Sequence, residues 1–156
     1  MQRMAQEAQA MNENLMFRDR LLYEIQKAFY DERGKGARYR LTTTAVSFVK
    51  ERLQEKVGDI GEIKKYLEES ELVEGMKWSE DEISFRVQID GCCLKQVRDD
   101  FTDTGLQPLS CPMANIIMNA LEMKSSLSPE LLPIEFEENT CSLTMAKIAT
   151  SDVVEG

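Results

Sequence analysis

The fold of this chain is decided by one stretch, Ile83-Ser84-Phe85-Arg86-Val87-Gln88-Ile89-Asp90-Gly91-Cys92-Cys93. Its first eight residues alternate strictly between apolar and polar side chains, beginning with apolar Ile83. A period of two over this length predicts a strand with one buried face and one wet face. The strand leads directly into two cysteines, so it places thiols at its end.

Two more strands and a buried helix complete the predicted architecture. Segments 133–137 and 141–148 are typical of strands, and Glu138-Asn139-Thr140 between them predicts a tight antiparallel hairpin in which Asn139 tolerates left-handed backbone. Pro112 suits the first turn of a helix, and residues 111–124 are apolar on both faces, which indicates burial. We therefore predict an α+β fold, in which N-terminal helices pack with a small antiparallel sheet (strands near 83–90, 133–137 and 141–148).

The N-terminal part is predicted to be helical. Residues 1–31 contain no Gly or Pro and are rich in good helix formers. Met1, Met4, Ala8 and Met11 recur at spacings of three or four, which indicates either a helix-pairing seam or a frayed terminus. We therefore assign residues 1–31 to an oligomerisation helix of a homodimer, 32–149 to one ligand-binding domain and 150–156 to a tail.

Shorter signals mark two further helices and a turn. The hydroxyl groups of Thr42-Thr43-Thr44 are candidate N-caps for a helix that follows them, and Asp59 is a candidate cap for the next helix. Gly75 ends that run, and Trp78 precedes a polar turn.

The amino-acid composition argues against several classes of function. The 156 residues carry a net charge of −9, which argues against general nucleic-acid binding. The chain has no His, so His-dependent nucleophilic catalysis and His-ligated zinc within the chain are excluded. No apolar run approaches the roughly 18 residues of a membrane span. The opening residues are polar rather than signal-like, so we expect a cytoplasmic protein with reduced thiols.

Cys111 is the candidate for reactivity among the four cysteines. It stands just before a helix, where backbone N–H groups and the helix dipole would lower the pKa of its thiol. The alternative is a small buried hydrophobe. Cys92 and Cys93 are adjacent and point opposite ways in extended backbone, so only one of them faces a shared pocket. Cys141 opens the last strand.

Cys92, Cys111 and Cys141 are also candidate ligands of zinc or an iron–sulfur cluster. The chain lacks the C-x-x-C pairs that most such sites use, which counts against a metal.

The second half of the chain resembles a known family. The order of strand, Cys, Cys-led helix and Cys-bearing hairpin is carried by Val87-Gln88-Ile89-Asp90-Gly91-Cys92, Leu109-Ser110-Cys111-Pro112 with residues 114–122, Ile134-Glu135-Phe136-Glu137 and Thr140-Cys141-Ser142-Leu143. This order resembles the 4-vinyl reductase domain of bacterial and archaeal hydrocarbon-binding proteins, whose fold group includes the trafficking-particle (TRAPP) subunits. The resemblance implies an α+β domain with an apolar cavity for sensing or carrying a ligand.

Three functions follow as hypotheses. The first is a binding domain for a small apolar, hydrocarbon-like ligand. The second is a Cys-dependent hydrolase of a small cyclic amide, because small hydrolases that act on thiazoline carboxylates have a similar layout. The third is a Cys-ligated metal or redox protein. For the first, the candidate ligand-binding residues are Phe85, Val87, Cys92, Cys111, Met113, Ile116, Ile117 and Met145.

Overall fold

The computed structural model describes residues 1–34, 41–125 and 127–149, so the predicted tail at 150–156 lies outside the described residues. The chain divides into two compact units. One contains helices α1 (Gln2–Arg33) and α4 (Lys95–Asp103), and the other contains the sheet and the remaining helices. The sequence-based division placed the residues of α4 in the same domain as the sheet, whereas the structure groups α4 with α1.

The first unit is a pair of helices. The ring of Tyr23 on α1 meets the ring of Phe101 on α4 edge to face, with 4.8 Å between their centroids. Phe101 is fully buried. The N-terminal helix predicted over 1–31 is confirmed. None of the helices in the described ranges has the length and apolar character that crossing a membrane requires.

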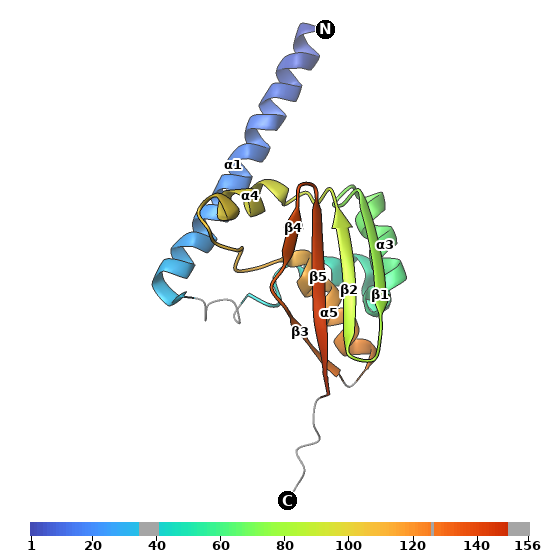
Figure 1. Ribbon diagram of the computed structural model, residues 1–156. Helices are drawn as coiled ribbons and strands as arrows, with labels where there is room; N and C mark the ends of the chain where they lie inside the picture. The colour runs from blue at the N-terminus through green and yellow to red at the C-terminus, as the bar shows by residue number, and fades with distance from the viewer. Residues whose placement is uncertain (35–40, 126, 150–156) are drawn as a thin grey trace, which may run out of the picture. The chain divides into compact units, whose positions relative to one another are not determined.

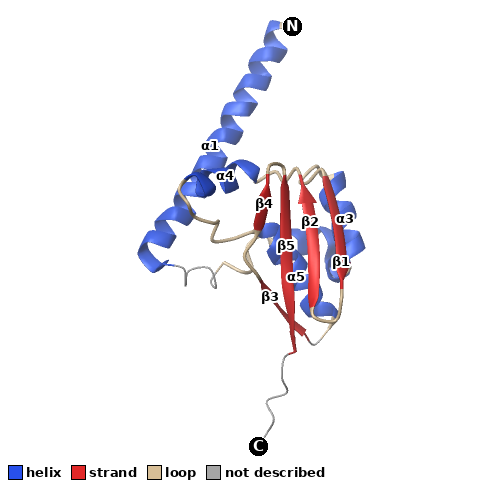
Figure 2. Cartoon of the chain, viewed as in Figure 1, coloured by secondary structure: helices blue, strands red, loops and turns tan. Residues whose placement is uncertain are grey.

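The second unit is built on an antiparallel sheet (Figure 2). Strands β1 (Gly75–Glu80), β2 (Ser84–Asp90), β5 (Thr140–Ala149) and β3 (Leu127–Leu131) are neighbours in that order, and β4 (Glu135–Glu137) also pairs with β5. The α+β class is confirmed. Neither β1 nor β3 was predicted. β1 buries a single residue fully, Met76, and β3 contains Pro129, so neither carries a clear alternating pattern.

The alternating stretch forms β2, with one correction. Phe85, Val87 and Ile89 are buried as predicted, but Ile83 is 74% exposed. The carboxylate of Asp81 accepts hydrogen bonds from the backbone N–H groups of Ile83 (2.9 Å) and Ser84 (2.8 Å). This turn holds Ile83 outside the strand, so the strand begins at Ser84 and the alternation loses its first member.

The hairpin of β4 and β5 is also confirmed, and its left-handed residue differs from the expectation. Glu138 has a φ of 46°, whereas the sequence pointed to Asn139. The register sets Phe136 opposite Cys141 and Glu137 opposite Thr140. The turn therefore comprises Glu138 and Asn139, and the left-handed conformation falls on the first of the two.

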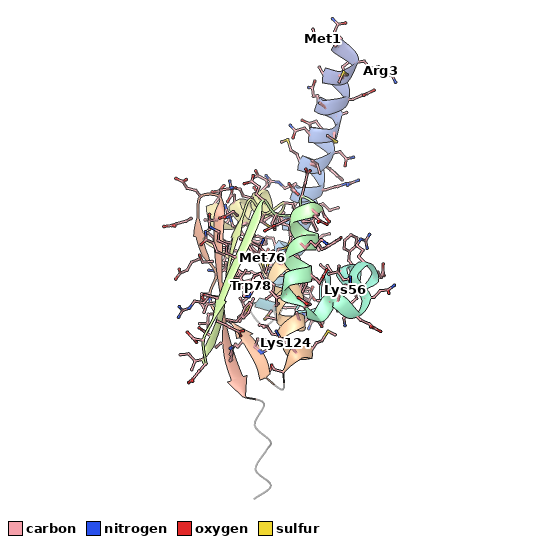
Figure 3. The ribbon with its side chains drawn as sticks, turned by 90° about the vertical axis from the view of Figure 1, so that its right-hand side faces the viewer. Met1, Arg3, Lys56, Met76, Trp78 and Lys124 are labelled. Atoms are coloured by element: carbon pink, nitrogen blue, oxygen red, sulfur yellow. The ribbon has the colours of Figure 1, made fainter. Side chains whose placement is uncertain are left out.

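Three helices, α2 (Val46–Leu53), α3 (Ile60–Glu69) and α5 (Pro112–Lys124), lie over one face of the sheet (Figures 1 and 3). A short 3-10 helix, η2 (Gln54–Gly58), joins α2 to α3. Met76 and Trp78 lie on the side of β1 that faces α3 (Figure 3). The other face of the sheet is polar, as the exposed side chains of Arg86 and Gln88 illustrate.

The helix caps confirm one prediction and overturn another. Asp59 caps α3, since its carboxylate accepts from the N–H groups of Gly61 (2.8 Å) and Glu62 (3.2 Å). The threonines do not cap α2. Its N-cap is Ala45, with a φ of 70° and no side-chain cap bond. The hydroxyl of Thr44 is instead engaged with the carbonyl of Leu41 (3.0 Å) and with other partners described below.

The core lies between the helices and the sheet. It is one continuous cluster, consisting of Val49, Val57, Ile60, Ile63, Leu67, Val73, Met76, Phe85, Val87, Ile89, Met113, Ala114, Ile116, Ile117, Ala120, Ile134, Leu143 and Met145. The buried character predicted for helix 111–124 is confirmed, because α5 contributes five of these residues and also buries Asn115.

Candidate functional site

Three thiols meet at the edge of the core. Cys92 follows the end of β2, Cys111 is the N-cap residue of α5, and Cys141 is the second residue of β5, opposite Ile89 of β2. All three cysteines are partly buried and pack against the core cluster. Cys111 is near enough to Cys92 and Cys141 for a charge on either sulfur to raise its pKa. We call this set of Cys92, Cys111 and Cys141 the thiol cluster.

Cys93 does not belong to the cluster. It is exposed, whereas its neighbour Cys92 packs on the core. This agrees with the expectation that only one of the two adjacent thiols faces the interior. None of the four cysteines is disulfide-bonded.

The pKa of Cys111 moves in the direction opposite to the expectation. Burial of the sulfur raises the pKa of Cys111 to about 12. The backbone N–H groups of Ala114 and Met113 act to lower it, as expected at a helix start, but burial outweighs them. Cys111 is therefore a protonated thiol at neutral pH, and the prediction of a lowered pKa is wrong because it counted the helix terminus without the surrounding core.

A tight turn positions Cys92. Gly91 has a φ of +60°, and its N–H donates to the carbonyl of Asn139 (2.9 Å) in the β4–β5 turn. A Cβ at this position would lie 2.3 Å from both Cγ and Cδ of Glu74. The Glu74 side chain in turn accepts a hydrogen bond from Asn139 (3.2 Å). Any other residue at position 91 would therefore strain the left-handed backbone and displace the Glu74 side chain.

The polar residues beside the turn are well satisfied. The hydroxyl of Thr140 donates to Asp90 (2.6 Å), and the amide of Gln88 donates to the same carboxylate (3.4 Å). These two hydrogen bonds hold the pKa of Asp90 below its usual range, and the bond from Thr140 has the larger effect. The carboxylate at the end of β2 is therefore ionised at neutral pH and fixed in place.

A buried asparagine, which was not predicted as a site residue, anchors the start of α5. Asn115 is 4% exposed. Its Nδ2 lies within hydrogen-bonding distance of the carbonyls of Leu41 (3.0 Å) and Thr44 (3.2 Å), of Thr44 Oγ1 (2.9 Å) and of Ser110 Oγ (3.2 Å). The available signal was a polar residue within the apolar run from Met113 to Met118, since buried amides require partners. This network ties the chain before α2 to the residues on either side of Cys111.

The eight predicted ligand-binding residues come together in this unit. Cys92 and Cys111 pack against the core from its edge, and the other six, Phe85, Val87, Met113, Ile116, Ile117 and Met145, are themselves core residues. The residues predicted as the wall of a pocket thus form the packed interior beneath the thiol cluster. Phe136 on β4 and Leu143 on β5 belong to the same region and were not predicted.

The thiol cluster does not fit a zinc or iron–sulfur centre. Among the described residues, no group of three or more His, Cys, Asp or Glu side chains is arranged to hold a metal ion. A metal bound there would also have to displace the proton that burial keeps on the Cys111 thiol. The donor set predicted from the sequence, Cys92 with Cys111 and Cys141, therefore lacks the arrangement that these metals require.

Comparison with known proteins adds no relative. Searches of protein-family models, curated proteins and solved structures found no match to this chain. The resemblance to the 4-vinyl reductase domain consequently stays a prediction that rests on the residues quoted above.

Proposed function

We propose that the sheet-bearing unit is a non-catalytic domain that binds a small apolar ligand at the thiol cluster. The observation that carries this proposal is the state of Cys111. Its thiol lies close to those of Cys92 and Cys141, against an apolar core, and burial keeps it neutral. Neutral thiols behave as small polarisable hydrophobes. Together with Cys92 and Cys141, which come from two other parts of the fold, Cys111 forms a surface suited to hydrocarbon-like groups.

The residues beneath the cluster support an adaptable site. Met113 at the start of α5 and Met145 on β5 are both in the core cluster that the thiols pack against. Unbranched methionine side chains repack around ligands of different shape at small cost. Binding sites for small molecules are predominantly apolar, with a few placed polar groups. The ionised Asp90 at the end of β2, in the turn that leads to Cys92, is a polar group of this kind.

The hydrolase hypothesis receives less support. A nucleophilic cysteine acts as a thiolate. With a pKa of about 12, Cys111 is ionised in roughly one molecule in a hundred thousand at pH 7. The chain also has no His that would accept the proton. The burial of Cys111 thus suppresses its reactivity as a nucleophile.

The two adjacent cysteines supply a matched test. Dodecanoic acid and cinnamic acid serve as apolar probes, with binding followed by calorimetry and by the rise in melting temperature. Cys92→Leu changes a side chain that packs on the core, and Cys93→Leu makes the same substitution at an exposed position. We expect at least one probe to bind, Cys92→Leu to change its affinity several-fold, and Cys93→Leu to leave it within twofold.

A second readout follows the thiols directly. Bound probe should slow the alkylation of Cys92 by N-ethylmaleimide, measured by mass spectrometry, and leave the alkylation of Cys93 unchanged. The proposal fails if neither probe raises the melting temperature, or if the two leucine variants change affinity equally.

A further inference from the structure

Helix α1 exposes apolar side chains along its whole length. It has 32 residues, so it is about 48 Å long at 1.5 Å per residue, and none of its residues is buried. Met4 is 74% exposed, Met11 65%, Leu15 50% and Ile25 58%. An isolated helix is marginally stable in water, and most helices are held by the packing of an apolar face. The apolar side chains of α1 therefore indicate a surface that another molecule covers.

Most of these side chains follow a coiled-coil repeat, and exposed Met16, Phe17 and Leu21 lie beside it. Steps of three and four residues alternate without a break along one line, which we call the seam: Met4, Ala8, Met11, Leu15, Arg18, Leu22, Ile25 and Phe29. This spacing averages 3.5 residues, the period with which two helices wind around each other. All seam positions are apolar except Arg18.

Helix α4 leaves the seam open. Its Phe101 packs on Tyr23, and Asp100 lies close enough to Asp19 to act on its charge. Positions 19 and 23 each follow a seam position by one residue, so they lie about 100° further round the helix. Leu22 remains 43% exposed beside Tyr23. The first unit therefore uses one side of α1 internally and presents the seam on another.

We propose that α1 pairs through this seam with the α1 of a second copy of the chain, in antiparallel orientation. A parallel pair in register would place Arg18 against Arg18, and two like charges at a seam position repel each other. In the antiparallel register that uses every seam position, Arg18 meets Leu15 of the second copy. In the same register Met4 meets Phe29 and Ala8 meets Ile25, so the smallest seam residue faces a large one.

The charge of α1 favours a protein partner over a membrane surface. The helix carries five basic and six acidic residues, which gives it a net charge of −1. Helices that lie on membranes have polar faces rich in Lys and Arg, which attract anionic lipids. A helix with a 3.5-residue apolar period pairs with another helix that has the same period, and the α1 of a second copy has it.

The test is the mass of the full chain in solution, measured by sedimentation equilibrium over a range of concentrations. We expect twice the chain mass of 17.8 kDa. Leu15→Asp lies in the seam and should weaken the dimer at least tenfold. Phe17→Asp removes a side chain that is 71% exposed but off the seam, and should change the dissociation constant less than twofold.

Two further variants distinguish a weakened dimer from a misfolded chain and determine the relative orientation of the two α1 helices. Arg18→Leu should tighten the dimer at least tenfold, a gain that loss of structure cannot imitate. A photo-crosslinking benzoylphenylalanine at position 4 should join the second copy near residue 29. The proposal is overturned if the chain is a monomer at all concentrations, if Phe17→Asp weakens the dimer as much as Leu15→Asp, if Arg18→Leu does not tighten it, or if the crosslink falls near residue 4 of the second copy.

Discussion

Replacing Gly91 with Ala tests how the thiol cluster is held in place. Gly91 has a φ of +60°, and a Cβ there would meet Cγ and Cδ of Glu74 at 2.3 Å. The left-handed backbone alone costs an L-residue about 1–2 kcal/mol. Alanine also restricts the unfolded chain more than glycine does, which stabilises the variant by about 0.4–1 kcal/mol. The net dihedral cost is therefore about 1 kcal/mol.

The clash adds to this cost. Because 2.3 Å is far inside van der Waals contact, Glu74 must leave its position and lose its hydrogen bond with Asn139. A lost hydrogen bond costs about 0.5–1.5 kcal/mol. We therefore expect Gly91→Ala to lower the free energy of unfolding by about 1.5–2.5 kcal/mol, measured by urea denaturation followed by circular dichroism.

Gly105 provides the matched control. Its φ is +72°, but a Cβ there would have nothing within 4 Å among the described residues. Gly105→Ala should therefore show the dihedral cost alone, about 1 kcal/mol. In a Glu74→Ala background, which already lacks the clash and the hydrogen bond with Asn139, Gly91→Ala should cost only the dihedral term of about 1 kcal/mol. If Gly91→Ala costs no more than Gly105→Ala, the close approach of Glu74 does not constrain the turn and the reasoning is refuted.

Three other perturbations test the buried groups. Alkylation of Cys111 by iodoacetamide should be much slower than that of exposed Cys93 from pH 7 to about pH 9, because burial raises the pKa of Cys111 to about 12. A Cys111 that is alkylated as fast as Cys93 would contradict this. Burial, and to a smaller extent the charge of Asp100, raises the pKa of Asp19. Above that raised pKa the charge of Asp19 destabilises the packing of α1 with α4. The destabilisation disappears as the pH falls to the ordinary pKa of about 3.9, because Asp19 is then protonated in both the folded and the unfolded chain. Asp19→Asn should therefore raise the melting temperature at pH 7 but not at pH 3.5, and an equal gain at both pH values would disprove the assignment. Asn115→Ala should cost about 1–2 kcal/mol in urea denaturation, because it removes the amide donor near the Leu41 and Thr44 carbonyls while the Ser110 and Thr44 hydroxyls still donate to Leu41. Asn115→Asp, which places a charge against these carbonyls, should cost more, and an aspartate variant as stable as the native chain would rule the network out.

Patterns that are local in the chain were predictable. The alternation in 84–90, the polar turn at 138–139 and the apolar helix after Pro112 each carry their own signal, and each forms the expected element. β1 and β3 carry no such signal, because each is short and gains its place by pairing with a longer strand. Ile83 was assigned to the buried face because the hydrogen bonds of Asp81 that end the strand are invisible to a period count.

The chemistry of the site depends on distant residues, which limits what its sequence can predict. The amide of Asn115 finds its partners at Leu41 and Thr44, more than seventy residues earlier. The pKa of Cys111 likewise depends on the core that β2, β5 and α5 build around it. A helix start can be read from Pro112, but the burial of the sulfur beside it cannot, and burial decides the sign of the shift.

The raised pKa also makes Cys111 a reporter of its own surroundings. Its sulfur faces the N–H groups of Ala114 and Met113, which lower the pKa, and an apolar environment that raises it more strongly. Whatever admits water to the thiol cluster removes the second effect and leaves the first, so the opened state has a thiolate that reacts and the closed state has a thiol that does not. A ligand that fills the cluster and an opening that hydrates it therefore move the alkylation rate of Cys111 in opposite directions. The rate at a fixed mildly alkaline pH measures the population of the opened state, which connects the packing of the core to the occupancy of the proposed site.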